Sequence, residues 1–385
     1  AIAAARKRLL SPFNVFAAVV VVVGLILLWI RFTRGLGAVT NLSNPYPWGL
    51  WIGFDVLCGE ALAAGGFTLA AAVYLLGLQR YRPLLRPAIL TGLLGYIFAG
   101  IAVLIDLGRP WRFPIPLFYS FGVSSVMFLV IWLVVLYIIV QFIEFSPAIF
   151  EKFGFKTACH WIRKLTVPIV IAAVIIATLH QSALGALFLL APTKLHPLWY
   201  SPLIPVFFFV SSIIAGLAMV IFESAVSHRI FRSQADPAHV ASLDELTLGL
   251  GRAAAVALFC YFFLKWIGVA RGRHWDLLTT PMGLWFLVEM LIFVLLPCLL
   301  FAWGVRRANA SLVRVTGLLT VIGIVINRLN VSVIALRWNY PQRYWPHWME
   351  LTITICIITV GVLTFRWIVN RMPVLREHPD YKAIH

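Results

Sequence analysis

The chain has 385 residues, of which 62% are hydrophobic and only 12% are charged. Several uninterrupted apolar runs exceed the roughly 18 residues that mark a membrane-spanning helix, so the composition predicts a polytopic membrane protein. In a soluble chain, the net charge of +17 would suggest a nucleic-acid partner, but here the Lys and Arg residues lie mainly in short loops between the apolar runs. We therefore expect the charge to report membrane topology, with lipid around the chain and no nucleic acid bound.

We predict an all-α fold of about ten transmembrane helices, with residues 1–385 forming a single integral membrane domain. The apolar runs place the spans at residues 12–32, 48–78, 87–106, 117–145, 165–190, 202–228, 246–270, 281–305, 312–336 and 348–369. Three spans begin with a proline directly after a hydroxyl residue, which suits a helix cap and first turn: Ser11-Pro12, Ser201-Pro202 and Thr280-Pro281. A run of Gly and Ala at 59–66 predicts close helix packing.

The basic residues alternate between the two sides of this map. Loops on the side of the N-terminus hold about twice as many Lys and Arg residues as loops on the other side. By the positive-inside rule we expect both termini in the cytoplasm, with 371–385 as a cytoplasmic tail. The longest hydrophilic stretch between spans, 228–245, is too short to fold alone, so a large catalytic module would have to come from another chain.

Cysteine and histidine usage bears on cofactors. The five cysteines stand singly, without a CxxC pair, an iron–sulfur spacing or a CxxCH haem attachment. A membrane b-haem needs two facing histidines at matched depth, yet His180 is the only histidine well inside a predicted span. Nucleotide-binding and HExxH motifs are also absent from the sequence. We therefore expect no metal, haem or iron–sulfur cluster in this chain.

The densest group of buried charges lies between Trp48 and Glu60. A charge at membrane depth is costly unless it is paired or hydrated, so each one is a functional hypothesis. Regular helical spacing places Trp48, Trp51, Asp55 and Gly59 on one stripe and turns Glu60 about 140° away from Asp55. The stripe would suit a slot for a flat aromatic head group with a proton acceptor at its base. It would equally suit an interfacial aromatic belt with a carboxylate paired to an arginine.

Other charged and titratable residues lie inside or at the rims of the spans. Asp106 and Arg109 are three residues apart, which predicts a rim ion pair that can also orient a substrate oxygen. His180 is either a satisfied interior hydrogen bonder or the proton partner of a reaction near neutral pH. Buried Arg328 needs a counter-charge, which favours a pair with a carboxylate. The remaining acids suggest a relay across the membrane: Glu144, Glu223, Glu289 and Glu350.

Several segments occur together in one order over nearly the whole chain. They are Pro47-Trp-Gly-Leu-Trp-Ile-Gly-Phe-Asp55 with Ala64-Gly-Gly66, Arg82-Pro-Leu-Leu-Arg-Pro87, Ile105-Asp-Leu-Gly-Arg109, Leu179-His-Gln-Ser-Ala-Leu-Gly185, Leu195-His-Pro-Leu-Trp199 and Val220-Ile-Phe-Glu223. In this combination the chain resembles the NrfD/PsrC family of membrane quinone-reacting subunits. It is most similar to the HybB-type branch, from membrane-bound nickel–iron hydrogenases.

The resemblance implies two four-helix bundles with flanking helices and no redox centre within the chain. It also implies electron exchange between menaquinone and a periplasmic ferredoxin-like iron–sulfur subunit, in a bacterial or archaeal inner membrane. The family's quinone site lies near the outer face, which assigns to it Trp51, Asp55, Asp106, Arg109 and His180. Glu60 departs from the HybB pattern, which has an uncharged residue there, and points to a related branch from sulfur-metabolising complexes.

These features predict a quinone-reactive subunit of a hydrogen:quinone oxidoreductase that is inactive without its nickel–iron hydrogenase partners. His180 with Asp55 or Asp106 would supply protons to the quinone. The relay residues would be Glu60, Glu144, Glu223, Glu289, Arg328 and Glu350. The alternatives are the equivalent subunit of a sulfur-metabolism or molybdoenzyme complex, a secondary transporter with proline-broken helices, and a purely structural anchor.

Overall fold

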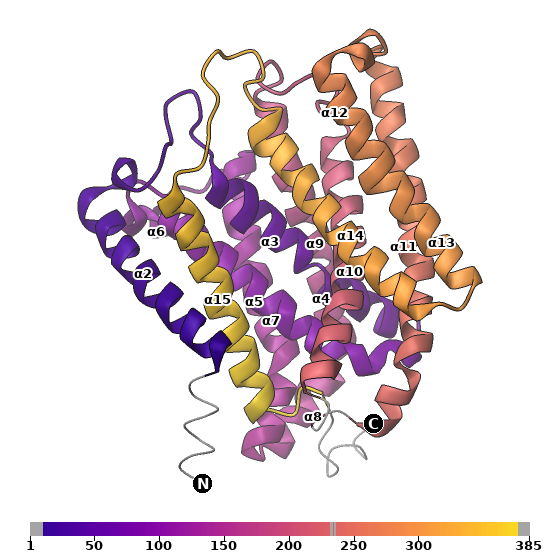
Figure 1. The fold of residues 1–385 in the computed structure, drawn as a ribbon. Coiled ribbons are helices and arrows are strands. Elements are labelled where there is room, and N and C mark those ends of the chain that lie inside the picture. The colour runs from indigo at the N-terminus through magenta and orange to yellow at the C-terminus, as the bar shows by residue number, and fades with distance from the viewer. Residues whose placement is uncertain (1–10, 232–233, 235, 376–385) are drawn as a thin grey trace.

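The structure, a computed structural model, describes residues 11–231, 234 and 236–375. In this part of the chain all regular structure is helical, apart from one isolated bridge between Leu195 and Leu336. Ten helices are long and apolar enough to cross a membrane, which confirms the predicted all-α membrane fold. Figure 1 shows that α2 (Pro12–Arg34) begins at the same end of the molecule at which α15 (Trp348–Arg371) ends. We call this end the terminal face and the opposite end the far face.

The first four-helix bundle is formed by the second to fifth spans. Its segments are η2 (Trp51–Val56), α3 (Leu57–Leu62), α4 (Gly65–Ala70) and η3 (Ala71–Leu75), then η4 (Gln79–Tyr81) and α5 (Arg82–Asp106), then α7 (Val126–Phe153), and finally α9 (Thr166–Ala186) with η6 (Leu187–Leu190). A short amphipathic helix, α8 (Lys156–Lys164), joins α7 to α9 at the terminal face.

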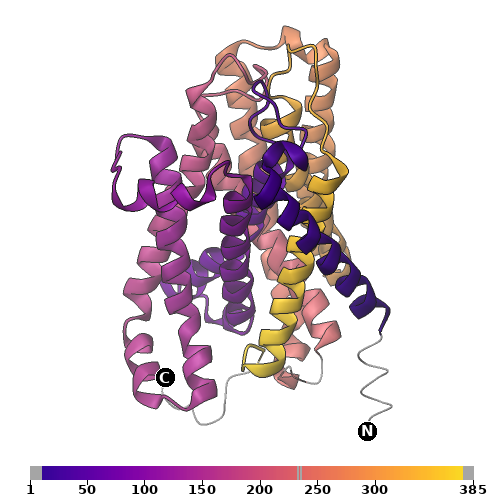
Figure 2. The same cartoon turned by 90° about the vertical axis from the view of Figure 1, so that its left-hand side faces the viewer.

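The second bundle is formed by the sixth to ninth spans. Its segments are α10 (Ile204–Ile230), α11 (Pro237–Gly272), α12 (Pro281–Met290) with η8 (Leu291–Leu295) and α13 (Leu296–Arg306), and α14 (Ala310–Leu329) with η9 (Asn330–Ile334). Helix α10 also packs on α9, α3 and α4, and so joins the two bundles. Helices α2 and α15 pack on each other and on the first bundle as flanking helices, visible at the side of Figure 2.

The helices extend further than hydropathy alone predicted at several ends. Helix α5 begins at Arg82 and includes Pro87, and α11 begins at Pro237, because polar turns continue a helix beyond its apolar core. The fourth span begins later than predicted, because residues 114–118 form the separate short helix α6 (Pro114–Phe118). From residue 376 onward, the predicted tail lies outside the described residues.

Two of the three predicted caps are confirmed. The Ser11 and Thr280 side chains accept hydrogen bonds from backbone N–H groups in the first turns of α2 and α12. Ser201 does not cap α10, which begins only at Ile204. Its hydroxyl accepts instead from the backbone N–H of Leu203 at 3.2 Å.

The small residues at 59–66 allow α4 and α10 to approach closely. A Cβ atom added to Gly216 of α10 would lie 2.7 Å from both the carbonyl carbon of Ala64 and the backbone nitrogen of Gly65. A Cβ atom on Gly65 would lie 2.8 Å from a methyl group of Val220. The predicted packing role of this run is thereby confirmed.

The π-helical segment η2 changes which side chains of the second span share a face. A π-turn holds more residues than an α-turn, so the helical spacing used for the sequence does not apply here. Trp48 precedes the segment, and its ring meets Phe188 edge-on with centroids 5.9 Å apart. Trp51 faces α15 instead, where its indole N–H donates to the carbonyl of Glu350 at 3.3 Å. The prediction that both tryptophans share one stripe is therefore wrong.

Candidate functional site

Two fully buried titratable side chains meet inside the first bundle. Oε2 of Glu60, on α3, lies 2.7 Å from Nε2 of His180, on α9. The next residue, Gln181, donates its amide to the backbone carbonyl of Glu60 at 3.2 Å. An apolar interior accommodates such groups only when they are paired, so α9 fixes Glu60 through both its side chain and its backbone.

Further hydrogen-bonding side chains continue from this pair towards the terminal face. Nε2 of Gln181 also lies 2.9 Å from the hydroxyl of Tyr96, whose ring packs edge-on against Tyr137 with centroids 4.4 Å apart. Gln141 donates to the Tyr137 hydroxyl at 2.9 Å. Glu144 follows at the spacing that puts it on the same face of α7. We call this set the polar file: Glu60, His180, Gln181, Tyr96, Tyr137, Gln141 and Glu144.

Glycines make room for the polar file. A Cβ atom on Gly92 of α5 would lie 2.5 Å from Nε2 of Gln141 and 3.1 Å from the carbonyl oxygen of Ala63. A Cβ atom on Gly66 of α4 would lie 3.0 Å from the same amide nitrogen. Gln141 therefore enters the bundle only because both neighbouring helices lack a side chain there.

Unpaired polar atoms recur along the polar file. Among the described residues, hydrogen-bond partners are missing for Nδ1 of His180, Oε1 of Gln181, Oε1 of Gln141 and both carboxylate oxygens of Glu144. Buried polar atoms normally bond to protein or to ordered water. Polar atoms without a hydrogen-bond partner therefore occur along the polar file from His180 to Glu144.

Glu223 lies beside the polar file. It accepts a hydrogen bond from the hydroxyl of Thr91 at 2.8 Å, while its other oxygen has no partner among the described residues. Thr91 precedes Gly92, the glycine that admits Gln141. The predicted relay acids Glu60, Glu144 and Glu223 thus belong to one region of the structure.

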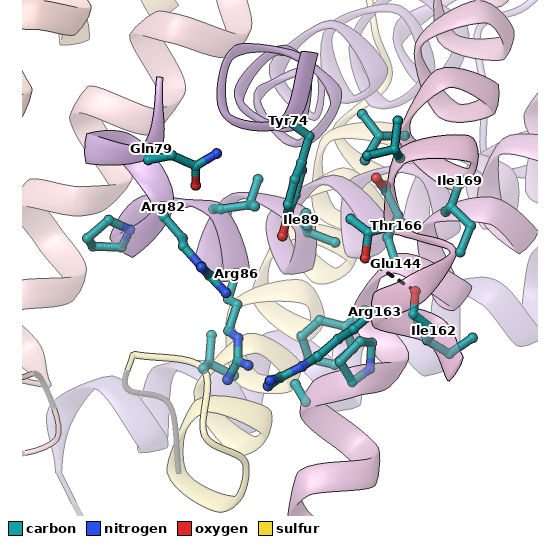
Figure 3. A pocket seen from close by; sticks show the side chains of 18 of the residues that line it. Tyr74, Gln79, Arg82, Arg86, Ile89, Glu144, Ile162, Arg163, Thr166 and Ile169 are labelled. Carbon is teal, nitrogen blue, oxygen red and sulfur yellow. Dashed lines mark hydrogen bonds between the residues drawn. The ribbon is translucent and has the colours of Figure 1, made fainter. Parts of the chain in front are cut away.

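Glu144 reaches a cavity of about 630 Å³ at the terminal face. The cavity lies between the end of the second span and the adjoining ends of α5, α7 and α9. Figure 3 shows the Glu144 side chain near Thr166, with Arg82, Arg86 and Arg163 around the same space. The polar file therefore connects a buried pair to a cavity at one end of the bundle.

The residues predicted to bind quinone fall into separate places. Trp51 packs in one apolar cluster with Ile105, the neighbour of Asp106. Asp55 accepts a hydrogen bond from the hydroxyl of Thr354, on α15, at 2.7 Å. Arg109 is exposed beyond the end of α5, and His180 lies with Glu60. Asp55 and Glu60 thus face different neighbours, as predicted.

Asp106 does not form the predicted rim ion pair with Arg109 in the described part of the chain. The buried side chain of Arg31, on α2, reaches this end of α5: its guanidinium donates to the carbonyl of Ile105 at 2.7 Å and to that of Leu107 at 2.5 Å. These bonds satisfy carbonyl groups at the end of α5 that have no partner within the helix.

A second buried polar cluster lies in the other bundle, around Glu289. Its carboxylate accepts from the indole N–H of Trp199 at 2.7 Å and from the amides of Asn327 and Asn330 at 2.6 Å and 2.5 Å. Lys265, inside α11, is only 4% exposed. These groups are separate from the polar file.

Arg328 belongs to this second cluster but has neutral partners. Its guanidinium donates to the Ser211 hydroxyl at 2.9 Å and to the Phe208 carbonyl at 3.2 Å, and lies 3.9 Å from the Phe208 ring centroid. Arg328 forms no ion pair with a carboxylate among the described residues, so the favoured prediction for Arg328 is wrong. Carbonyl, hydroxyl and π-electron contacts satisfy the cation instead.

Glu350 has a structural explanation. It closes a capping box with His347 at the start of α15, and it accepts from the backbone N–H groups of His347 at 3.0 Å and Asn41 at 2.9 Å. The Tyr344 hydroxyl donates to its other oxygen. Burial and this bond raise the pKa of Tyr344 above its ordinary value.

Sequence analysis missed Tyr96, Tyr137 and Gln141 as functional candidates. A signal was present, because Tyr137, Gln141 and Glu144 recur at helical spacing within an otherwise apolar span. Thr354 could not have been linked to Asp55 in this way, since the two residues meet only through the packing of α15 on the second span.

Known proteins resemble the chain over almost its full length. A protein of Nitratidesulfovibrio vulgaris is 49% identical over 382 residues, covering 99% of this chain and 98% of its own. The probable Ni/Fe-hydrogenase 2 b-type cytochrome subunit of Escherichia coli is 30% identical, covering 96% and 93%. The integral membrane subunit of the menaquinone reductase of N. vulgaris is 24% identical, covering 96% and 94%.

The name of the E. coli relative includes a b-type cytochrome, so the fit of a haem to this chain matters. A six-coordinate b-haem needs two facing histidines, and within the described spans only His180 lies deep, with Nε2 bonded to Glu60. His228 lies near the end of α10, and its Nδ1 is 2.8 Å from the Ser224 carbonyl. The described residues also contain no group of three or more metal-ligating side chains. These residues do not fit a bis-histidine haem.

The family comparison covers both bundles. The model of the family described as "Polysulphide reductase, NrfD" matches residues 38–336, which run from the loop after α2 to the end of the ninth span. The match agrees with the shared architecture and with the relatives that cover nearly the whole chain. The chain belongs to the NrfD family of integral membrane subunits of oxidoreductase complexes.

Proposed function

We propose that this chain is the quinone-reactive subunit of a respiratory complex and exchanges electrons between menaquinone and an iron–sulfur partner at the far face. Relatives named as a hydrogenase subunit and as a menaquinone reductase subunit support this role. The observation that carries it is the polar file, which leads from the cavity at Glu144 to the unpaired Nδ1 of buried His180.

The Glu60–His180 pair suits proton delivery to a quinone. Reduction of a quinone to a quinol consumes two electrons and two protons, so its ring oxygens need a proton donor within hydrogen-bond reach. Glu60 holds Nε2 of His180 and leaves Nδ1 for a quinone oxygen. A doubly protonated imidazole would donate its Nδ1 proton to that oxygen and remain as the neutral ring with Nε2–H on Glu60.

The second proton would come from the region around Trp51, Asp55 and Asp106. These residues lie towards the far face, where we propose that the quinone binds. One carboxylate oxygen of Asp55 already accepts a hydrogen bond from the Thr354 hydroxyl. The quinone ring would therefore approach the other carboxylate oxygen of Asp55. Arg109, exposed just beyond the end of α5, is a candidate contact for a partner or substrate.

The polar file would return protons to His180 from the terminal face. Glu144 and the side-chain amides of Gln141 and Gln181 have unused bonding capacity that ordered waters can connect. If the terminal face is cytoplasmic, as the basic loops predict, protons and electrons reach the quinone from opposite sides and turnover is electrogenic. The relay proposal rests on the acids of the first bundle, because Glu289 and Arg328 form a separate cluster and Glu350 caps a helix.

Proteoliposomes that contain the whole complex and menaquinone would test the proposal. We expect His180→Ala and Glu144→Gln to slow quinone reduction by about 10²–10⁴-fold, the usual contribution of a positioned acid or base. Glu245→Gln removes a carboxylate from the exposed surface of α11 and serves as the matched control. Quinone reduction and membrane potential at wild-type levels in both folded variants would rule out the polar file as the proton route.

We propose a nickel–iron hydrogenase with a periplasmic ferredoxin-like iron–sulfur subunit as the partner module. The supporting observation is the 30% identity to the E. coli hydrogenase subunit over 96% of the chain. A molybdoenzyme or sulfur-metabolism module is the alternative, since more distant relatives are named as a selenate reductase subunit and as a putative dimethyl sulfoxide reductase membrane subunit. Metal analysis of the purified native complex decides between them: nickel with iron supports the first, and molybdenum without nickel supports the second.

A further inference from the structure

Helix α2 turns one cation towards the protein. Its buried positions are Ala17, Gly24, Leu27 and Arg31, of which Arg31 alone is charged. Trp29, two residues earlier, is 72% exposed, as expected for a helix that faces lipid. A charge that is buried at the edge of a membrane is costly, so its surroundings need an explanation. The proposed function has so far given this cation no role.

Arg31 has more hydrogen-bond donors than it uses. A guanidinium carries five N–H groups. The Nε atom and one Nη atom of Arg31 donate to the carbonyl groups of Ile105 and Leu107. The described residues supply no other hydrogen-bond acceptor to this side chain. Three N–H groups therefore remain at the end of α5 for water or for a ligand.

Asp106 lies between the two residues whose carbonyl groups Arg31 holds. Its Oδ1 atom is buried and has no hydrogen-bond partner in the described part of the chain. Arg31 and Glu350 are the charged groups that act on this carboxyl electrostatically. Arg31 and Asp106 nevertheless form no ion pair, because none of their N–O distances is within 4.0 Å. Opposite charges that lie close without contact leave space for a bridging polar group.

The chemistry of the two groups defines what can bridge them. Arg31 needs an acceptor, and the Asp106 carboxylate needs a donor. A hydroxyl group offers both, because its oxygen accepts a hydrogen bond while its O–H donates one. The carboxylates of Asp106 and Glu350 would oppose an anion, and Arg31 would oppose a cation. The pair therefore fits a neutral hydroxyl better than a phosphate, a carboxylate or an amine.

The surroundings of the pair suit a flat apolar ring. One apolar cluster at this end of α5 also draws on α2, η2 and α15, and its members include Leu27, Trp51, Ile105 and Ile353. Gly108 lies two residues beyond Asp106, and a Cβ atom added to it would meet nothing within 4 Å. Small-molecule sites combine apolar walls with a few fixed polar groups. An aromatic hydroxyl can thus reach Asp106 from the open side while its ring lies against the cluster.

Arg31 also lies outside the part of the chain that the family model matches. That model covers residues 38–336, whereas α2 ends at Arg34 and α15 begins at Trp348. These two flanking helices pack on each other and on the first bundle. Family membership therefore gives Arg31 no role, and a role for it has to be argued from its own contacts.

We propose that Arg31 is a binding residue of the far-face site and that, together with Asp106, it holds the hydroxyl group of a quinol. An N–H of Arg31 would donate to the hydroxyl oxygen, and the O–H would donate to Oδ1 of Asp106. A quinone carbonyl only accepts hydrogen bonds, so the oxidised ring would bond to Arg31 without bonding to the carboxylate. The pair would thus favour the reduced ring. This inference rests on the proposed function, in which the quinol is the product of quinone reduction.

Ligand binding to the full chain in lipid nanodiscs would test the contact. Tryptophan fluorescence can compare a short-chain naphthoquinol, kept reduced under anaerobic conditions, with the matching naphthoquinone. We expect Arg31→Gln to weaken naphthoquinol binding by about 10–100-fold, the usual effect of losing a hydrogen bond to a charged group. Arg34→Gln removes an exposed arginine three residues further along α2 and is the matched control, which should leave binding unchanged.

Asp106→Asn distinguishes binding from a structural role, because the buried Oδ1 atom has no bond in the protein to lose. This variant should weaken naphthoquinol binding by about tenfold. It should bind naphthoquinone at least as tightly as wild type, since an amide can donate to a carbonyl. The Arg31→Gln/Asp106→Asn double variant should lose less than the product of the two single fold-changes, because both side chains hold one hydroxyl.

Arg31→Lys addresses the bonds that Arg31 makes to the end of α5. It retains the charge and one donor for these carbonyl groups, and should recover part of the naphthoquinol affinity that Arg31→Gln loses.

Several results would overturn the inference. Wild-type affinity for naphthoquinol in Arg31→Gln, in a complex that still reduces menaquinone, would remove this role of Arg31 and leave the proposed function intact. Equal losses in Arg31→Gln and Arg34→Gln would assign the effect to surface charge. Single losses that multiply in the double variant would show that the two residues share no hydroxyl. A wild-type chain that binds neither ring, in a complex that reduces no menaquinone, would refute the proposed function and this inference together.

Discussion

The pairing of Glu60 with His180 can be measured on the isolated chain by a double-mutant cycle. Glu60→Leu leaves the His180 ring with neither nitrogen bonded, because Nδ1 already has no partner among the described residues. His180→Leu leaves a carboxylate without its partner in an apolar interior. Both residues are at most 1% exposed, so water cannot replace the lost bond without a structural change.

The expected magnitudes follow from this burial. Breaking a buried pair by removing one partner costs about 3–5 kcal/mol. Removing both partners leaves no orphaned group, so the double variant should lose less than the sum of the two single losses. We expect a coupling free energy of about 1–3 kcal/mol, in the range measured for contacting groups.

Equilibrium unfolding in mixed detergent micelles would give the three free energies. Glu60→Gln, which keeps the shape of the side chain, should fall between wild type and Glu60→Leu. Single losses that add to within about 0.5 kcal/mol would show that the two side chains do not interact. The hydrogen bond at 2.7 Å would then be refuted as an energetic link.

Three more predictions concern stability. Gly216→Ala should cost about 1–3 kcal/mol or more in unfolding free energy, because its Cβ would lie 2.7 Å from backbone atoms of Ala64 and Gly65. Glu350→Ala should cost about 1–3 kcal/mol, because three donors lose their acceptor at the start of α15, and thermal unfolding would show it. Burial, aided by nearby His274, lowers the pKa of His196 to about 4, so its stabilisation is complete above pH 6.5 and disappears as the pH falls towards 4.

Controls distinguish these effects from general damage. Gly37→Ala, where an added Cβ meets nothing within 4 Å, should leave stability nearly unchanged. His196→Asn keeps an acceptor for the backbone N–H of Leu198, which now donates to Nδ1 at 3.2 Å, and should flatten the pH dependence between 6.5 and 4. An unaltered pH profile in that variant would assign the acid loss of stability to other groups. Unchanged melting of Glu350→Ala would mean that the cap is dispensable.

The fold was largely predictable because membrane insertion leaves a strong pattern in sequence. The ten predicted apolar runs correspond to ten candidate membrane-spanning helices, and the predicted caps at Ser11 and Thr280 are present. The errors arose where polar turns lengthen a helix, as at Arg82, and where short local structure interrupts an apolar run, as in α6. Hydropathy indicates which residues contact lipid. A helix, in contrast, continues as long as its backbone N–H and C=O groups have hydrogen-bond partners.

The site was less predictable because its contacts depend on which helices become neighbours. His180 and Glu60 were both recognised as costly buried groups, yet spacing could not show that α9 faces α3. Arg328 was expected to need an acid, but backbone and hydroxyl oxygens supplied its bonds. A buried charge in a sequence therefore predicts that partners exist without predicting their type.

The number of residues in the π-helical segment from Trp51 to Val56 determines how the residues before it are oriented relative to Glu60. Deleting one residue there would restore α-helical turns and rotate the preceding residues by about 100° relative to Glu60. Trp51 would then turn away from α15 while Glu60 still met His180. Such a deletion leaves the side chains of Glu60 and His180 unchanged. It would nevertheless change the orientation of the first half of this helix relative to the second half, and the two halves now contact different neighbours.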